Sequence, residues 1–105
     1  MTREKRITEI EWQGIKIEVH CVPSYSPSFE NSYGYPLVHI ELYSIEPHRA
    51  PLPITETGYR SHFTPAPNLD EWGNEVVFIR AWLDDAAQSP EWISQTEASR
   101  QGNLF

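Results

Sequence analysis

Apolar and polar residues alternate on both sides of the dipeptide Gln13-Gly14. The segment ITEIEWQGIKIEVHCV contains two such runs, and strict alternation over this length predicts two half-buried β-strands. Gly14 permits a two-residue turn, because glycine adopts positive φ without strain. With that turn, the predicted cross-strand pairs are Trp12–Ile15, Glu11–Lys16, Ile10–Ile17 and Thr8–Val19. The apolar pairs then share one face, so we expect a hairpin with one side turned to the core.

A third strand is predicted over LVHIELYSI, with Val38, Ile40 and Leu42 facing inward and His39, Glu41 and Tyr43 facing outward. Residues 23–36, before this strand, have the composition of a loop. The segment 46–68 is rich in proline and longer than most loops, so it is either functional or contains a further element. Its sequence GYRSHF is a candidate fourth strand, with Tyr59 and Phe63 on one side and Arg60 and His62 on the other.

Helical periodicity begins at about Asn74. Val76, Ile79, Leu83 and Ala86 recur at helical spacing, and Phe78 and Trp82 widen the apolar stripe, which predicts a helix over 74–88. Ser89-Pro90-Glu91 then provides an N-cap, a proline at the first helical position and an acid in the first turn, which predicts a second helix over 90–100. The expected fold is α+β in the order βββαα: a small antiparallel sheet of three or four strands, covered on one face by the two helices.

Composition and length indicate one packed domain. The chain has 105 residues, of which 39% are hydrophobic, and we expect a single domain over 1–100 followed by a tail over 101–105. No apolar run approaches the roughly 18 residues of a membrane span, and the charged start has no hydrophobic stretch behind it. The single cysteine, Cys21, fits a reducing compartment. These features predict a cytoplasmic protein with no membrane partner.

The formal net charge is −7, with 15 acidic against 8 basic residues. Three of the bases (Arg3, Lys5 and Arg6) lie in the first six residues, so the rest of the chain is more acidic still. A protein that binds duplex DNA needs clustered Lys and Arg to neutralise phosphates, so we expect no direct contact with nucleic acid. The acidity either serves solubility or imitates DNA to a basic DNA-binding protein, as an inhibitor of that protein would.

Two sets of side chains are candidates for chemistry. Glu18, His20, His39 and Glu41 project from the outward faces of neighbouring strands, and such ligands hold a divalent metal when the strand register brings them together. The alternative is a solvated sheet face, and we expect neither metal nor cofactor. Cys21 points away from its neighbour His20 and continues the inward apolar row, so it is predicted to be a buried hydrophobe.

The run TETGYRSHF forms a possible ligand loop through Tyr59, Arg60 and His62. Arg60 is suited to binding an anion and His62 to acid–base chemistry, so a small metal-dependent or acid–base enzyme remains an alternative function. The other interpretation is a cap over a sheet edge, with Tyr59 and Phe63 as packing anchors. No reaction class follows from these residues, which favours a non-enzymatic protein.

The chain ends on QGNLF, which resembles the pentapeptide Gln-Leu-Ser/Asp-Leu-Phe by which bacterial replication and repair proteins dock on the β sliding clamp. The resemblance implies that Gln101 enters a polar pocket of the clamp while Leu104 and Phe105 fill an apolar one. Gly102 departs from the pattern, which removes one anchor and adds backbone entropy to be lost on binding. The alternative is that Gly102 ends the helix in a left-handed conformation and Leu104 packs back on it.

The segments APLPITETGYRSHF and AWLDDAAQSPEW resemble a group of small uncharacterised bacterial proteins, some of them encoded near mobile-element genes. That resemblance implies a bacterial cytoplasmic setting and assigns no site residue. Together, the two resemblances favour a non-enzymatic bacterial interaction protein whose C-terminal tail docks on a protein partner, the sliding clamp.

Overall fold

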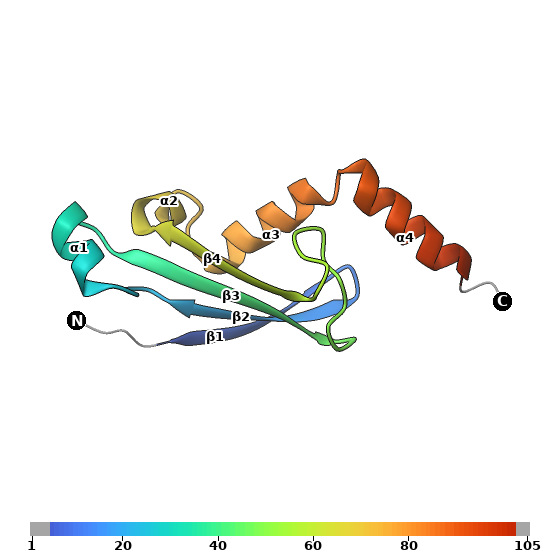
Figure 1. Cartoon of the computed structure of the whole chain (residues 1–105), viewed down its shortest axis with the longest axis horizontal. Coiled ribbons are helices and arrows are strands. Elements are labelled where there is room, and N and C mark those ends of the chain that lie inside the picture. Colours follow the sequence, from blue (N-terminus) through green and yellow to red (C-terminus); the bar gives the residue numbers. More distant parts are fainter. Residues whose placement is uncertain (1–4, 103–105) are drawn as a thin grey trace.

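The computed structural model describes the backbone of residues 5–102 and the side chains of residues 5–98. Four strands form one antiparallel sheet in the order β1-β2-β3-β4, and helix α3 lies across one face of it (Figure 1). The predicted α+β class is confirmed. The order of elements in this part of the chain is ββαββααα rather than βββαα, because two short helices and the candidate fourth strand are present.

The hairpin of β1 (Arg6–Trp12) and β2 (Ile15–Val22) has the predicted register. Its pairs are Trp12–Ile15, Glu11–Lys16, Ile10–Ile17 and Thr8–Val19. Gln13 and Gly14 both have positive φ, at 48° and 78°, which is the backbone of the two-residue turn that matches the twist of paired strands. Turn length and alternation are both local properties, so the sequence was sufficient to predict this register.

GYRSHF forms part of β4 (Tyr59–Pro65), which pairs with β3 (Leu37–Glu46). The predicted alternation is confirmed, because His62 pairs with Ile40 on the helix-covered face. Tyr59 and Phe63 pack on neighbouring rings of the sheet, Tyr43 and His39, but they are not buried. Their side chains are 42% and 45% exposed on the opposite face, since that face has no covering helix in the described part of the chain.

One short helix lies in a segment predicted as a loop, and another begins in the segment predicted to be functional or to contain a further element. The loop prediction for 23–36 is corrected by α1 (Pro27–Tyr33), and residues 46–68 contain the start of α2 (Ala66–Asp70) as well as β4. The signal for α1 was present: the Ser26 hydroxyl accepts from the Phe29 amide, Pro27 opens the helix, and Gly34 ends it at φ 81°. The composition of the segment is typical of a loop, so this short helix was not predicted.

Helix α3 (Glu75–Ala86) builds the core with the inward side of the sheet. Asn74 caps its first turn, and Ile79 and Leu83 are fully buried against strand residues such as Ile40. Cys21 is also fully buried, and burial together with the nearby Glu75 carboxylate raises its pKa to about 11. The prediction of a buried cysteine is therefore confirmed.

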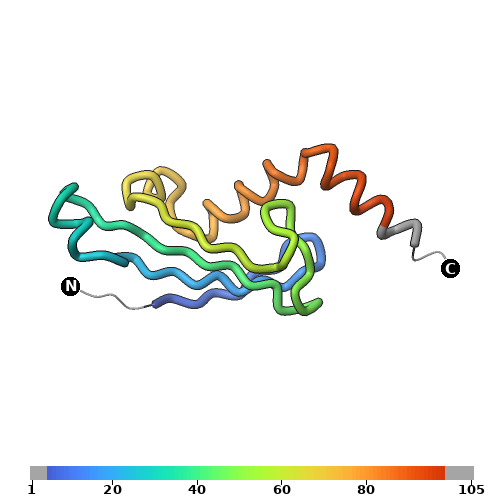
Figure 2. The backbone as a smooth tube through the Cα atoms, viewed as in Figure 1, coloured from blue at the N-terminus to red at the C-terminus, as the bar shows by residue number. Residues whose placement is uncertain are grey.

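Helix α4 (Pro90–Gly102) exists as predicted, but it does not cover the sheet. It projects away from the body beyond the end of α3 (Figures 1 and 2). Trp92, in its first turn, is buried and packs on Trp12 with ring centroids 5.8 Å apart, whereas Ile93 is 45% exposed. Only one of the two helices covers the sheet, because α4 has a single large apolar residue facing the body over its described side chains.

The helix continues through Gly102, two residues further than predicted. Gly102 is the last described residue and is helical, while Leu104 and Phe105 lie outside the described residues. Among the helices of residues 5–102, none combines the length and the apolar character needed to cross a bilayer.

Candidate functional site

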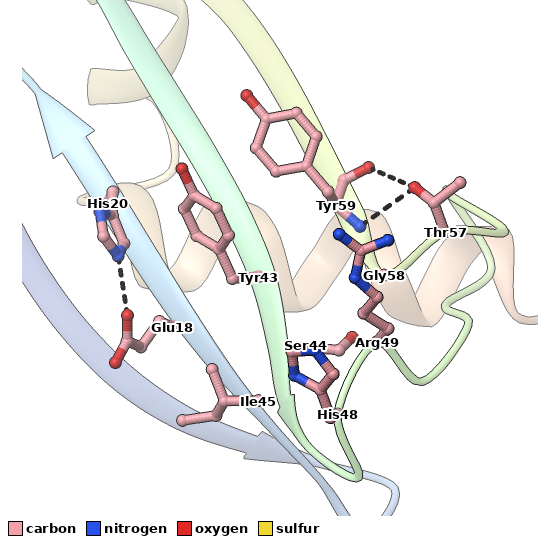
Figure 3. Close-up of a pocket in the computed structure, with 10 residues that line it drawn as sticks. All are labelled: Glu18, His20, Tyr43, Ser44, Ile45, His48, Arg49, Thr57, Gly58 and Tyr59. Atoms are coloured by element: carbon pink, nitrogen blue, oxygen red, sulfur yellow. Dashed lines mark hydrogen bonds and ion pairs between the residues drawn. The ribbon is translucent and has the colours of Figure 1, made fainter.

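The sheet face opposite α3 carries aromatic and acidic side chains from neighbouring strands. His20 of β2, Tyr43 of β3 and Tyr59 of β4 point to this face, as the register of the three strands requires. At one end of this face, the strands and the segment 45–58 enclose a pocket of about 530 Å³ (Figure 3). The lining residues are Glu18, His20, Tyr43, Ser44, Ile45, His48, Arg49, Thr57, Gly58 and Tyr59.

Three rings form the wall of the pocket that lies on the strands. The centroids of His20 and Tyr43 are 4.7 Å apart, and those of Tyr43 and Tyr59 are 5.1 Å apart. Figure 3 shows the three rings in a row across β2, β3 and β4, with the Glu18 carboxylate beside His20. The His20 Nε2 lies 2.8 Å from a Glu18 oxygen. The row follows from strand pairing, because cross-strand neighbours on one face lie about 5 Å apart.

The hydroxyl groups of this wall converge on Glu41. Tyr59 donates to the Glu41 carboxylate at 2.7 Å and Tyr43 donates at 3.2 Å, while the Lys5 ammonium lies 4.0 Å away. The hydrogen bond from Tyr59 is the main reason that the pKa of Glu41 is lowered. The same bond raises the pKa of Tyr59, and burial with the Glu41 charge raises that of Tyr43. Both tyrosines therefore act as hydrogen-bond donors rather than bases at neutral pH.

The opposite wall is a loop held close to the end of β3. The Ser44 hydroxyl donates to the Ala50 carbonyl at 2.7 Å, and the Ser44 amide donates to the Gly58 carbonyl at 2.8 Å. Gly58 has φ 77°, and a Cβ atom there would lie 2.7 Å from backbone atoms of Arg49. Only glycine fits at that close approach. The proline-rich segment is thus fixed in place, with the Arg49 side chain directed toward Tyr59 (Figure 3).

The four candidate metal ligands are not brought together. His20 is paired with Glu18, whereas the His39 Nε2 lies 2.8 Å from the Ser61 hydroxyl and its ring stacks on Phe63 at 4.3 Å. Across residues 5–98, no group of three or more His, Cys, Asp or Glu side chains is placed to hold a metal ion. The register sets His20 opposite Glu41, but His20 bonds to Glu18, and Glu41 accepts hydrogen bonds from Tyr43 and Tyr59. The amino-acid pattern alone does not specify these side-chain partners.

The three residues of the predicted ligand loop are divided between two faces of the sheet. Tyr59 enters the pocket, while Arg60 and His62 lie on the helix side. The Arg60 guanidinium donates to the Ile54 carbonyl at 3.1 Å and lies 5.2 Å above the Trp82 ring. His62 packs on Trp82 at 4.7 Å, and burial lowers its pKa, with a smaller contribution from the Arg60 charge.

Of the residues proposed for partner binding, only the backbone of Gln101 is described, and it lies on α4, outside the pocket. Leu104 and Phe105 fall outside the described residues. The aromatic residues of the segment 23–36 lie in two clusters. In the first, Tyr25 packs at 5.0 Å on both His39 and Phe63, at the far end of the open face. A second cluster consists of Phe29, Tyr33 and Tyr35.

Sequence reasoning found the strand residues of the pocket but missed its loop wall. Alternation placed His20 and Tyr43 on the outward face, and Tyr59 opposite Arg60. No local sequence pattern predicts that His48, Arg49 and Gly58 lie near those rings, because their position depends on how the segment 46–58 folds back on the sheet. The signal that was available was the length and the proline content of that segment.

Comparison with known proteins gives one match. The family model described as the KlcB third domain matches residues 5–92. No curated protein and no solved structure matches the chain. The matched span ends at Trp92, which is also the residue that packs the first turn of α4 on the body. The remainder of α4 and the QGNLF segment lie beyond the matched span.

Proposed function

The chain belongs to the KlcB third-domain family, and we propose that it is a non-enzymatic bacterial accessory protein that acts by binding a protein partner. The observation that carries this proposal is the departure of α4 from the body after Trp92, where the family match also ends. The described side chains that follow Trp92 are exposed, apart from the half-buried Thr96. An exposed helical arm attached to a packed body is suited to presenting a binding segment.

The pocket on the open face supports binding rather than a reaction. Its hydroxyl groups are already engaged, since Ser44 donates to the Ala50 carbonyl and both tyrosines donate to Glu41. Covalent catalysis requires a nucleophile in hydrogen-bond contact with a base. Within the described lining of the pocket, no Ser, Thr or Cys makes a hydrogen bond to a histidine ring.

We assign the partner by the resemblance of QGNLF to the clamp-binding pentapeptide. Gln101, Leu104 and Phe105 match the Gln, Leu and Phe positions of that pentapeptide, and the helical backbone from Trp92 to Gly102 extends roughly 15 Å at 1.5 Å per residue. That distance gives a partner room to approach. Because the contact is short and Gly102 lacks a side-chain anchor, we expect a dissociation constant of about a micromolar or weaker.

The test is binding of the purified protein to the purified bacterial β sliding clamp. Full-length protein is expected to bind, and a truncation that lacks residues 101–105 is expected to lose binding with its melting temperature nearly unchanged. A double variant, L104A with F105A, should lose binding equally. I93A is the matched control, because it removes an exposed apolar side chain from the same helix and should bind as the full chain does.

Two results would contradict the proposal. One is clamp binding that survives the truncation. The other is a large fall in melting temperature when residues 101–105 are removed, which would support a folded-back cap instead.

A further inference from the structure

Helix α3 has a second apolar side that the sheet does not cover. Phe78 lies three residues before Ala81 and four before Trp82, and Asp85 follows these two at spacings of four and three, so the four form one stripe along the helix. Together with His62 of β4 and Trp72, which precedes α3, they line a groove of about 480 Å³. The wide apolar stripe in the sequence therefore serves two surfaces: Ile79 and Leu83 fill the core, and the flanking residues form this groove.

Four rings make the walls of the groove. His62 lies 4.7 Å from Trp82 and 5.7 Å from Phe78, and Trp72 meets Phe78 edge to face at 6.2 Å. Trp72 is 47% exposed, which is unusual for the largest apolar side chain. The aromatic groove lies beside β4, the last strand of the sheet, where no further strand covers these rings.

The charges around the groove favour a cation. Asp85 is the only charged residue in its lining, and no side chain of residues 5–98 donates a hydrogen bond to its carboxylate or forms an ion pair with it. His62 stays neutral at pH 7, because burial lowers its pKa. Arg60 contacts Trp82 but does not line the groove, since its guanidinium is held by the Ile54 carbonyl.

We propose that this aromatic groove binds a lysine or arginine side chain presented by a partner protein. The faces of Trp and Phe rings attract cations, and a nearby carboxylate adds a direct counter-charge. A neutral apolar side chain would gain the ring contacts but no interaction with the Asp85 charge. The net charge of −7 draws a basic partner toward the surface. The site lies on β4 and α3, so it is independent of the tail.

The test is an NMR titration of the full-length chain, labelled with ¹⁵N. The probe is Nα-acetyl-lysine amide, and its control is Nα-acetyl-norleucine amide, which has a similar side chain without the charge. The indole N–H signals of Trp72 and Trp82 are expected to shift and saturate with the lysine probe. Trp12 and Trp92 serve as internal references on the core side. The lysine probe should bind about fivefold more tightly than norleucine, as expected for a cation at an exposed aromatic site.

Two variants give the matched comparison. Asp85→Asn is expected to weaken lysine binding several-fold, whereas Glu97→Gln, which removes one charge from the exposed side of α4, should leave it unchanged. Trp72→Ala should also weaken binding, and an unshifted Trp12 signal shows that the body remains folded. Equal binding of both probes, no binding of either, equal shifts at all four tryptophans, or no effect of Asp85→Asn would each overturn the proposal.

Discussion

Arg6 and Glu75 form a paired hydrogen bond between an edge strand and the first turn of α3. Arg6 Nε donates to one Glu75 oxygen at 3.0 Å, and Nη2 donates to the other at 2.9 Å. Glu75 is only 5% exposed, so this carboxylate is a buried charge that depends on its partner. The geometry fastens β1 to the helix that covers the sheet, across 69 residues of chain.

We expect Glu75→Gln to destabilise the protein by about 1–2 kcal/mol at pH 7, because it replaces charge-assisted hydrogen bonds with weaker ones. The hydrogen bond from Arg6 lowers the pKa of Glu75 below its ordinary 4.5. The ionised carboxylate therefore contributes stability that is present above about pH 4.5 and is lost as the pH falls through the lower folded-state pKa. Denaturant unfolding of both proteins at several pH values should show the difference shrinking in acid.

Glu46→Gln is the control for this experiment. Glu46 pairs with Lys16 at 3.5 Å, but its side chain is 72% exposed. An exposed pair of this kind contributes little, so we expect a change of less than about 0.5 kcal/mol. If both variants were destabilised equally, burial of the Arg6–Glu75 pair would not be the cause.

Gly58→Ala is expected to destabilise the protein more than Gly34→Ala. Both glycines have positive φ, at 77° and 81°, and both substitutions incur a penalty of about 1 kcal/mol for the left-handed backbone. A Cβ atom at Gly34 meets nothing within 4 Å, whereas one at Gly58 would lie 2.7 Å from the Arg49 backbone. The clash should add about 1–3 kcal/mol. Equal melting temperatures for the two variants would contradict the close approach of the loop.

Tyr59→Phe should raise the pKa of Glu41 toward its ordinary value. The hydroxyl of Tyr59 donates to the Glu41 carboxylate at 2.7 Å and is the largest cause of the lowered pKa. Tyr43→Phe is the matched variant and should have a smaller effect, because its bond is longer at 3.2 Å. An NMR titration that follows the Glu41 carboxyl carbon measures both. No change in Tyr59→Phe would mean that the hydrogen bond is not formed in solution.

Trp92→Ala should destabilise the protein by about 2–4 kcal/mol, because it removes the buried ring that packs on Trp12. By contrast, a truncation that removes residues 99–105 should change the free energy of unfolding by less than about 0.5 kcal/mol. The side chains of α4 that follow Trp92 are exposed or half-buried as far as Ala98, so they add little to the body. Denaturant unfolding of the two variants compares these effects, and a large loss on truncation would contradict the exposed arm.

Local sequence pattern was enough to predict the structure wherever the geometry of a short segment depends on its own residues. The Gln13-Gly14 turn sets the register of the first hairpin, and the apolar spacing from Val76 to Ala86 sets the buried side of α3. The position of α4 relative to the body does not follow from the local sequence. Its caps predict that a helix starts at Pro90, but whether it packs depends on the area available beside Trp12.

Alternation and helical spacing act over a few residues, so the amino-acid sequence was enough to predict three strands, the two longer helices and the face of the sheet on which each strand side chain lies. Which of those side chains meet depends on the folded domain. His20 bonds to Glu18 of its own strand and His39 to Ser61 of β4, so these side chains do not gather as a metal site. The fold of the segment 46–58 brought Arg49 to the tyrosine wall. These contacts depend on how the strands and the loop pack together, which a pattern of a few residues does not specify.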